Sequence, residues 1–476
     1  MQRELPSGSR TAQAPEASSQ ASIAILPFAN MSADPEKEFF ADGITEEIIN
    51  ALTQIDELHV AARTSAFSFK GKHVDLRIIG ERLNVKTVLE GSVRKAGNRV
   101  RITAQLINVA DGYHLWSERY DRELKDIFEV QDDIAKSIAD RLKVALKGGQ
   151  QAAVKPGTAN LEAYQLYLKG RALLYRRGLD IGRAAKCFEN AVALDPGYAL
   201  AWSGLADARN MLGLYGWERP NTIMPLAKDA ANRAIVLDPM LAEAHCSVAC
   251  VSHLYDWDWK RAEAGFLRAR ELNPRYTQNL CWYALFYLVW THGRFEEGIT
   301  IATEAAALDP LSAYAQGILS FCYSHPGRSK EAVRAATRAR ELEESFFSCW
   351  VLRDALHVNG QFEEAIAVGD VALALSGRHV FGISGHAMTL ADWGKNSAAQ
   401  ALYAELVARS AQGYVPPCHM AITASGAGEA DKAVAHAWEA YEIRDPMMVT
   451  ARFWPDFGRL RKDPRFNEIL TRVGLM

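Results

Sequence analysis

The tetrapeptide Ala193-Leu-Asp-Pro196 returns along the chain as Val236-Leu-Asp-Pro239, Glu271-Leu-Asn-Pro274 and Ala307-Leu-Asp-Pro310. The four prolines are therefore 43, 35 and 36 residues apart. A repeat of about 34 residues whose units end at a helix-breaking proline indicates stacked helical hairpins. Such a stack is more often a binding surface than a catalyst, so the pattern predicts a solenoid that recognises another molecule.

The clearest unit shows how two helices of a repeat are expected to pack. Large residues mark the first helix, and small residues followed by an exit proline mark the second: Trp282, Leu285, Phe286 and Val289, then Gly298, Ala302, Ala305 and Pro310. Small residues at a helix crossing allow the close approach of an antiparallel pair. This pattern resembles the tetratricopeptide repeat. We expect seven or eight units over residues 161–445, with degenerate units after Glu344 and an insertion around Tyr215–Pro220.

The resemblance to tetratricopeptide repeats implies a concave wall lined by the first helices. Carrying the family's groove positions onto this chain gives six candidate partner-binding residues: Asp207, Asn210, His253, Tyr283, Tyr287 and Trp290. Aromatic side chains beside a few polar anchors suit an extended peptide or a partner helix. The alternative is that several of these side chains pack between neighbouring helices, because a register shifts by one residue easily.

A different pattern precedes the repeats. Short apolar strands alternate with amphipathic helices, and Ala96-Gly97-Asn98 separates two alternating segments as the turn of a hairpin. The expected order is β-α-β-α-β-β-β-α over residues 22–147, which predicts an α/β domain with a mixed sheet. Residues 1–21 are expected to be a disordered tail, residues 148–160 a linker, and residues 446–476 a helical cap on the repeats.

This amino-terminal region resembles the TolB amino-terminal-like domain of bacterial signalling proteins. The carrying segments are Ile23–Phe28, Phe40–Glu47, Leu89–Arg94 and Leu115–Asp121. In that family the domain commonly precedes tetratricopeptide repeats, and an effector such as a class III adenylate or guanylate cyclase, a winged-helix domain or a kinase often stands ahead of the pair. Only about 21 residues precede the first strand here, so the resemblance implies an interaction half whose effector is supplied in trans or lost.

Composition restricts the function further. A net charge of -3 gives no electrostatic reason to expect direct nucleic-acid binding, and the longest apolar run, residues 280–290, is too short to cross a bilayer. All seven cysteines lie after residue 160 without a C-x-x-C pair, which is typical of small buried side chains in a reducing compartment. We expect a cytoplasmic protein, with a periplasmic or envelope location as the alternative.

Motifs for catalysis and for cofactor binding are absent from the sequence. It contains no P-loop, G-x-S-x-G elbow, H-E-x-x-H pair or kinase catalytic segment. Cys246, Cys250 and His253 share one helical stripe, but no fourth ligand is evident, and we expect no metal site. Asp42 is expected to face solvent or cap locally, and Gly43 to allow a close helix–sheet approach. The basic cluster Arg94, Arg99 and Arg101 is expected to be a solvated face.

These observations favour a non-enzymatic scaffold or regulatory module of bacterial signalling, without a cofactor, that binds a polypeptide in the repeat groove. Three alternatives stay open: an accessory or truncated member of a cyclase family, an envelope-associated assembly factor, and a transcriptional regulator that acts through another DNA-binding subunit. The sequence does not identify the partner or the oligomeric state.

Overall fold

The computed structural model describes residues 21–32, 38–53, 55, 57–142, 157–176, 180–324 and 327–476. The predicted tail up to residue 20 and the predicted linker up to residue 156 lie outside the described residues.

The amino-terminal domain is built on a mixed sheet with the strand order β3-β1-β4-β5-β6, with β2 paired to β4 at the side. Strand β1 runs parallel to both of its neighbours, β3 and β4, whereas β4, β5 and β6 form antiparallel hairpins. The strand bounds are β1 (Ala21–Ile25), β2 (Ala29–Asn30), β3 (Leu58–Val60), β4 (Thr87–Ala96), β5 (Arg99–Asn108) and β6 (His114–Glu123). The predicted hairpin therefore turns at Gly97-Asn98.

Helices cover both faces of this sheet. They are α1 (Glu38–Thr53), α2 (Arg63–Phe67), α3 (Leu76–Leu83), η2 (Leu124–Asp126) and α4 (Ile127–Arg141). Helix α3 starts where Asp75 accepts a hydrogen bond from the Arg77 amide at 2.8 Å, and it ends at Asn84 in the left-handed region. The predicted α/β fold class is confirmed, and the short elements β2 and α2 are the additions that the periodicity did not indicate.

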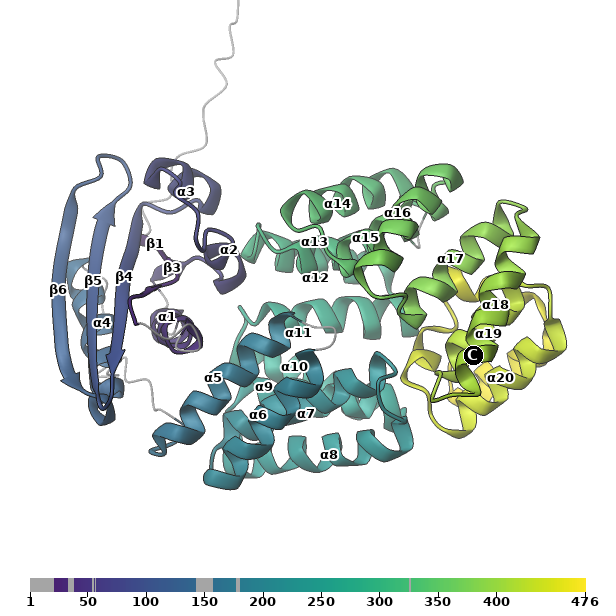
Figure 1. The fold of residues 1–476 in the computed structure, drawn as a ribbon, viewed down its shortest axis with the longest axis horizontal. Coiled ribbons are helices and arrows are strands. Elements are labelled where there is room, and N and C mark those ends of the chain that lie inside the picture. The colour runs from purple at the N-terminus through teal and green to yellow at the C-terminus, as the bar shows by residue number, and fades with distance from the viewer. Residues whose placement is uncertain are drawn as a thin grey trace, which may run out of the picture.

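From Leu161 onward the described residues form a helical region, as predicted (Figure 1). In the described residues the helices form eight antiparallel pairs: α5 (Leu161–Arg176) with α6 (Asp180–Leu194), α7 (Ala199–Leu214) with α8 (Pro220–Leu237), α9 (Ala242–Val251) with α10 (Trp259–Leu272), α11 (Thr277–Trp282) with α12 (Phe295–Leu308), α13 (Ala313–Ser324) with α14 (Ser329–Leu342), α15 (Phe346–Val358) with α16 (Phe362–Leu375), α17 (Val380–Asp392) with α18 (Asn396–Ser410), and α19 (Pro417–Gly426) with α20 (Ala430–Glu442). Two first helices continue as π-helices, η4 (Ser252–Asp256) and η5 (Tyr283–Thr291).

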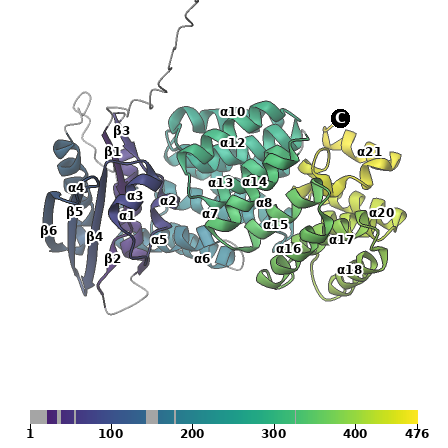
Figure 2. The same ribbon diagram turned by 90° about the horizontal axis from the view of Figure 1, so that it is seen from above.

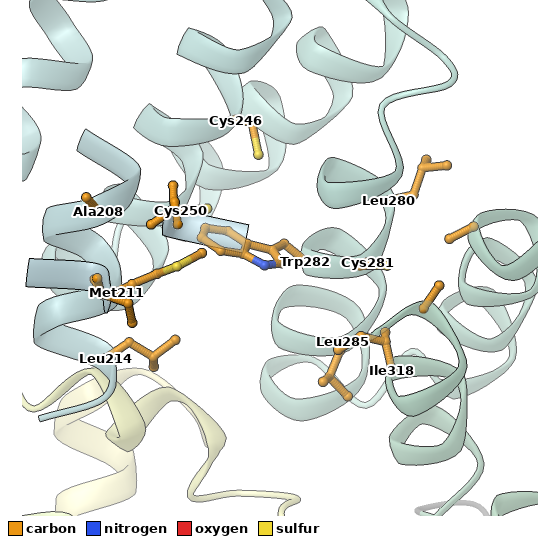
Figure 3. Packing of buried hydrophobic residues seen from close by; sticks show 14 of the residues in the cluster. Ala208, Met211, Leu214, Cys246, Cys250, Leu280, Cys281, Trp282, Leu285 and Ile318 are labelled. Carbon is orange, nitrogen blue, oxygen red and sulfur yellow. The ribbon is translucent and has the colours of Figure 1, made fainter. Parts of the chain in front are cut away.

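Small residues at the crossings set the spacing of each pair. A methyl group added at Gly298 would lie 2.4 Å from the Val289 side chain and 3.0 Å from the Ala284 carbonyl, so only glycine fits where α12 crosses η5. Large side chains fill the space between pairs, and Figure 3 shows the Trp282 indole pointing toward Met211 and Cys250. The packing pattern predicted from the sequence is the one that builds this core.

The insertion in the second repeat ties two distant parts of the superhelix together. Tyr215 packs against Phe381 and Trp217 against His379, with ring centroids 5.6 and 4.9 Å apart. Both contacts join the end of α7 to the start of α17, so the helical array curves back on itself.

The carboxy-terminal segment fills the inside of this curve. It comprises η6 (Pro446–Thr450), η7 (Pro455–Phe457), η8 (Leu460–Lys462) and α21 (Pro464–Val473). The 3₁₀ helices contact the first-helix elements α7, η4, η5, α17 and α19. Figure 2 shows the α/β domain at one end of the molecule and this segment toward the other. The carboxy-terminal segment therefore packs inside the superhelix as well as capping its end.

Candidate functional site

The six residues predicted to line an open groove are all buried. Their exposed fractions lie between 0% and 5% for Asp207, Asn210, His253, Tyr283, Tyr287 and Trp290. The prediction of an exposed wall at these positions is wrong, and the alternative of packing between helices describes them. The polar atoms of five of the six side chains bond to neighbouring repeat helices, whereas Trp290 packs against the carboxy-terminal segment, which occupies space that the sequence assigned to a partner.

Three of the six side chains make polar contacts between neighbouring repeats. Asp207 accepts a hydrogen bond from the Ser247 hydroxyl at 2.6 Å, and the Asn210 amide donates to the Ser247 carbonyl at 3.4 Å. His253 Nε2 lies 2.8 Å from Thr291 Oγ1, and burial lowers the pKa of His253 to about 3. These contacts hold the first helices in register and leave His253 neutral.

The three aromatic residues are also internal. The Tyr283 hydroxyl donates to Glu263 at 3.1 Å, and the Tyr287 hydroxyl donates to the Trp259 carbonyl at 3.0 Å. The Trp290 ring lies 5.7 Å from the Trp454 ring of the carboxy-terminal segment. Trp290 thus binds a peptide segment as expected of a groove aromatic, but the segment belongs to the same chain.

The possible metal stripe has a structural role. Among the described residues no group of three or more His, Cys, Asp or Glu side chains is arranged to hold a metal ion. His253 turns to Thr291, and burial raises the pKa of both Cys246 and Cys250, which keeps the thiols protonated. All seven cysteines are free.

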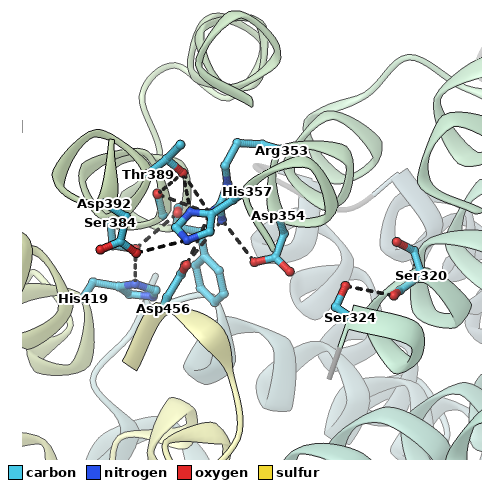
Figure 4. Close-up of polar contacts among 12 residues, drawn as sticks. Ser320, Ser324, Arg353, Asp354, His357, Ser384, Thr389, Asp392, His419 and Asp456 are labelled. Carbon is cyan, nitrogen blue, oxygen red and sulfur yellow. Dashed lines mark hydrogen bonds and ion pairs between the residues drawn. The ribbon is translucent and has the colours of Figure 1, made fainter. Parts of the chain in front are cut away.

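A buried polar cluster anchors the carboxy-terminal segment (Figure 4). Arg353 donates to both carboxylate oxygens of Asp456, at 3.3 and 3.4 Å, and also to the Gly385 carbonyl at 3.2 Å. Burial raises the pKa of the neighbouring Asp354 to about 6, against the opposing effect of Arg353. The pairing of Arg353 with Asp456 fixes the segment against α15 and α17.

Ser384 and His419 lie close together in the same region, with Ser384 Oγ 2.9 Å from His419 Nδ1. Burial lowers the pKa of His419 to about 3. Because both groups are fully buried, this pair joins α17 to α19 and presents no nucleophile to a substrate.

Two further predictions concerned the first helix, and both need correction. Asp42 is buried and accepts hydrogen bonds from the Lys70 ammonium at 2.6 and 2.7 Å, so it does not face solvent. Gly43 faces Leu168 of α5, where an added methyl group would lie within 3 Å of three side-chain atoms. The glycine therefore permits a close approach between α1 and the first repeat helix, not between a helix and the sheet.

The basic cluster on the hairpin is exposed, as predicted, and two of its members share one carboxylate. Arg99 and Arg101 each donate two hydrogen bonds to Asp121, which lowers the pKa of Asp121 to about 2. Arg94 lies on the same face and is exposed.

The open space of the inner wall lies at the junction of the two domains. A cavity of about 590 Å³ that is open to solvent lies between the α/β domain and the repeats, and its volume is within the size range of ligand sites. The repeat side comes from α5, which contributes Tyr175, and from the starts of the following first helices and the turns before them, which contribute Leu200, Glu243, Thr277 and Tyr314. The opposite side is formed by α1, the end of β3 and α2.

Glu46 holds one edge of this cavity. Its carboxylate accepts from Arg63 of α2 at 2.9 Å and from Arg171 of α5 at 3.3 Å, so one carboxylate joins two elements of the α/β domain to the first repeat. The Arg63 guanidinium also stacks over the rings of Phe67 and Tyr175, 4.0 and 4.2 Å from their centroids.

Ser65 holds the opposite edge. Its backbone N–H and its hydroxyl both donate to Asp309, at 2.9 and 2.5 Å, and its Oγ accepts from the Leu311 amide at 2.9 Å. Leu311 packs on the core formed by α3, β1 and β4. The exit of the fourth repeat is therefore fastened to α2.

Arg275 crosses the cavity wall between these two edges. Its guanidinium donates to the Val60 carbonyl, at the carboxyl end of β3, at 2.6 Å. Sequence reasoning did not select Glu46, Ser65, Arg171, Arg275 or Asp309 as site residues. A usable signal was the composition of the recurring tetrapeptide, since Asp309 belongs to its fourth copy and Arg275 follows its third.

Comparison with known proteins gives matches to parts of the chain. A family model described as the second domain of HilA/YgeH-like transcriptional regulators matches residues 19–137. A curated protein of Rhizobium meliloti (strain 1021) named putative adenylate cyclase 3 is 45% identical over 194 residues, which is 40% of this chain and 33% of the relative. The chain thus spans about a third of the length of this relative.

Solved structures show more distant likenesses. A human IFIT1 dimer with m7Gppp-AAAA is similar at a TM-score of 0.46 with 15% identity, covering 73% of this chain and 78% of that chain. YrrB, a tetratricopeptide protein described as having an unusual peptide-binding site, is similar at a TM-score of 0.27 with 16% identity, covering 42% of this chain and 96% of that chain. Likenesses of this size do not bear on function. The TolB resemblance of the first domain stays a prediction beside the HilA/YgeH match.

Within the described residues, no helix combines the length and the apolar character that a membrane span requires.

Proposed function

We propose that this protein is a non-catalytic regulatory module of bacterial signalling, in which the helical repeats bind a polypeptide partner under the control of the α/β domain. The observation that carries the proposal is the junction cavity. Polar contacts of Glu46, Ser65 and Arg275 join the two domains around this cavity. A molecule bound in the cavity would therefore contact both domains at once. Occupation would change the set of interdomain contacts, and the repeats would transmit the change to the bound partner.

The inner wall supports one refinement of this proposal. Its far half is filled by the carboxy-terminal segment, whereas the half near the α/β domain borders the cavity. A partner therefore binds near this junction or on the outer helices, and not at Tyr287 and Trp290 as the sequence suggested.

The experiment is a capture assay with the full chain. The tagged wild-type protein and the Asp309→Asn and Glu46→Gln variants are used to isolate partners from a bacterial lysate, with proteins quantified by mass spectrometry. We expect a partner whose recovery falls several-fold in both variants. The control is Glu341→Gln, which removes an exposed pair with Arg338 on α14. Equal recovery from all four proteins would refute control through the junction.

A second candidate is that the partner is a nucleotide cyclase. The identity of 45% to a putative adenylate cyclase over 40% of the chain favours it. The test is cyclic AMP synthesis by that cyclase with and without this protein added in trans; an unchanged rate across a range of concentrations would exclude this partner. The match to the HilA/YgeH family model favours the alternative of a transcriptional regulator. We also propose a cytoplasmic location, which is consistent with seven free cysteines and is tested by cell fractionation.

A further inference from the structure

Among the described residues, the arginine of the junction cavity that has no carboxylate partner is Arg275. Arg275 follows the third copy of the tetrapeptide, where the other copies have Gly197, Met240 and Leu311. Asn273 fixes the backbone of this turn by accepting from the Arg275 amide at 3.1 Å. The side chain then reaches from the repeats to the α/β domain and donates to the Val60 carbonyl. A neutral carbonyl uses one of its five N–H groups and leaves its charge uncompensated.

The neighbouring arginines are in a different state. Arg63 and Arg171 share the Glu46 carboxylate, whereas no carboxylate in the described residues forms an ion pair with Arg275. Burial lowers the pKa of Arg275, and no anion opposes this effect. The pKa of His59 is also lowered, first by burial and then by the positive charge of Arg275. A half-buried cation without a counterion is costly, and an anion supplied from outside would relieve that cost.

The carboxylates that line the cavity do not provide this anion. Glu46 is bound by two arginines, Asp309 is bound by Ser65, and in the described residues no ion pair joins the exposed Glu343 to Arg275. Burial raises the pKa of Glu243, which favours its neutral form, and no ion pair joins it to Arg275. The positive charge at the Val60 end of the cavity is therefore open to an incoming group.

The surrounding surface suits an aromatic or apolar body. The rings of Tyr167, Tyr175, Tyr276, Tyr314 and Phe67 line the cavity, and hydroxyl and amide groups of Thr64, Thr277 and Gln278 stand among them. Aromatic rings and small polar groups around Arg275, with Lys72 also in the lining, suit a small organic anion.

We propose that the cavity binds a small organic anion, whose carboxylate or phosphate pairs with Arg275 and whose aromatic body lies against the tyrosines. This inference rests on the proposed regulatory function and names the class of its effector. The anion would contact both Arg275 of the repeats and the β3–α2 segment, and would thereby strengthen the association of the two domains.

The experiment is isothermal titration calorimetry of the full chain with two matched pairs of probes. Phenyl phosphate is compared with phenol, and indole-3-acetate with indole-3-acetamide, which separates a phosphate from a carboxylate preference. We expect at least one anion to bind in the millimolar range or tighter, and its neutral analogue at least tenfold more weakly. Arg275→Gln should weaken the binding of that anion at least tenfold, Arg275→Lys should retain part of it, and Arg338→Gln on the outer surface should not change it.

Three outcomes would overturn the inference: no binding of either anion below 10 mM, equal binding of the neutral analogues, or unchanged binding by a folded Arg275→Gln variant. If that variant fails to fold, the comparison of anion with neutral analogue on the wild-type protein still decides. If the capture assay finds a partner that depends on Glu46 and Asp309 but no anion binds, this inference alone is refuted. Anion binding without any partner would sink only the proposed function.

Discussion

Ser65 and Asp309 are 244 positions apart in sequence and are joined by two hydrogen bonds to a single carboxylate oxygen. Asp309 is the aspartate of the fourth tetrapeptide. In the earlier copies the equivalent Asp195, Asp238 and Asn273 accept the amide of the residue two positions later, which closes a local turn. In the fourth copy that amide, from Leu311, goes to Ser65 Oγ instead. A turn motif of the repeats has become the docking point of the other domain.

Replacement of Asp309 tests this docking. Asp309→Ala leaves the Ser65 amide and hydroxyl without their acceptor in a buried place, which should cost about 1–3 kcal/mol of unfolding free energy. Hydrogen exchange should increase in the peptides that contain Ser65 and Leu311. The matched control is Asp238→Ala, which removes the same motif residue from an exposed local turn, and we expect less than about 1 kcal/mol there. Equal effects of the two substitutions would show that Asp309 has only its local role.

The sequence predicted the secondary-structure elements well, but it did not predict that the carboxy-terminal segment fills the inner wall of the helical repeats. The difference has a physical reason. Periodicity and turn residues report local structure, so the hairpin that turns at Gly97-Asn98 was predicted correctly. Whether the inner wall of a solenoid stays open depends on what the chain ends do, and a segment such as residues 446–462 carries no pattern that indicates where it packs. The candidate site failed for that reason: Trp290 has the composition of a groove residue but packs against Trp454.

Trp290 also provides a direct test of that correction. A groove aromatic could be removed without loss of stability, whereas Trp290 is 1% exposed and contacts Phe321 and Trp454. Trp290→Ala should therefore lower the unfolding free energy by about 3–5 kcal/mol. Urea unfolding monitored by circular dichroism measures the loss. The exposed Trp393 is the control, and its replacement by alanine should cost less than about 1 kcal/mol. An unchanged midpoint for Trp290→Ala would restore the groove interpretation.

The ion pair between Arg353 and Asp456 tests how the carboxy-terminal segment is held. Arg353→Met leaves the buried Asp456 without its counterion and should destabilise the protein by about 3–5 kcal/mol. Because Asp354 also lies 3.7 Å from Arg353, the substitutions are made in an Asp354→Asn background. There the double variant Arg353→Met, Asp456→Leu removes both charges of the pair and should recover much of this loss. Arg338→Met, at an exposed pair, should change stability by less than about 1 kcal/mol. Additive losses in the double variant, measured by urea unfolding, would contradict a coupled pair.

Glu47 makes the stability depend on pH. It lies beside Glu46 at the domain junction, and burial, with a smaller contribution from the Glu46 charge, raises its pKa from 4.5 to about 8. The folded protein therefore holds a proton between pH 4.5 and 8 that the unfolded chain has released. Because the folded state binds more protons, stability is greatest below pH 4.5 for this group and falls as the pH rises toward 8.

Glu47→Gln should remove this dependence, because glutamine keeps the neutral shape without a titration. The slope that Glu47 contributes is at most about 1.4 kcal/mol per pH unit, so wild type should lose several kcal/mol between pH 5 and 8 relative to the variant. Urea unfolding of both proteins at pH 5, 6, 7 and 8 measures the difference. Glu162→Gln, at an exposed position of α5, is the control and should follow wild type. Parallel pH profiles for wild type and Glu47→Gln would mean that Glu47 is charged in the folded protein and finds a counterion there.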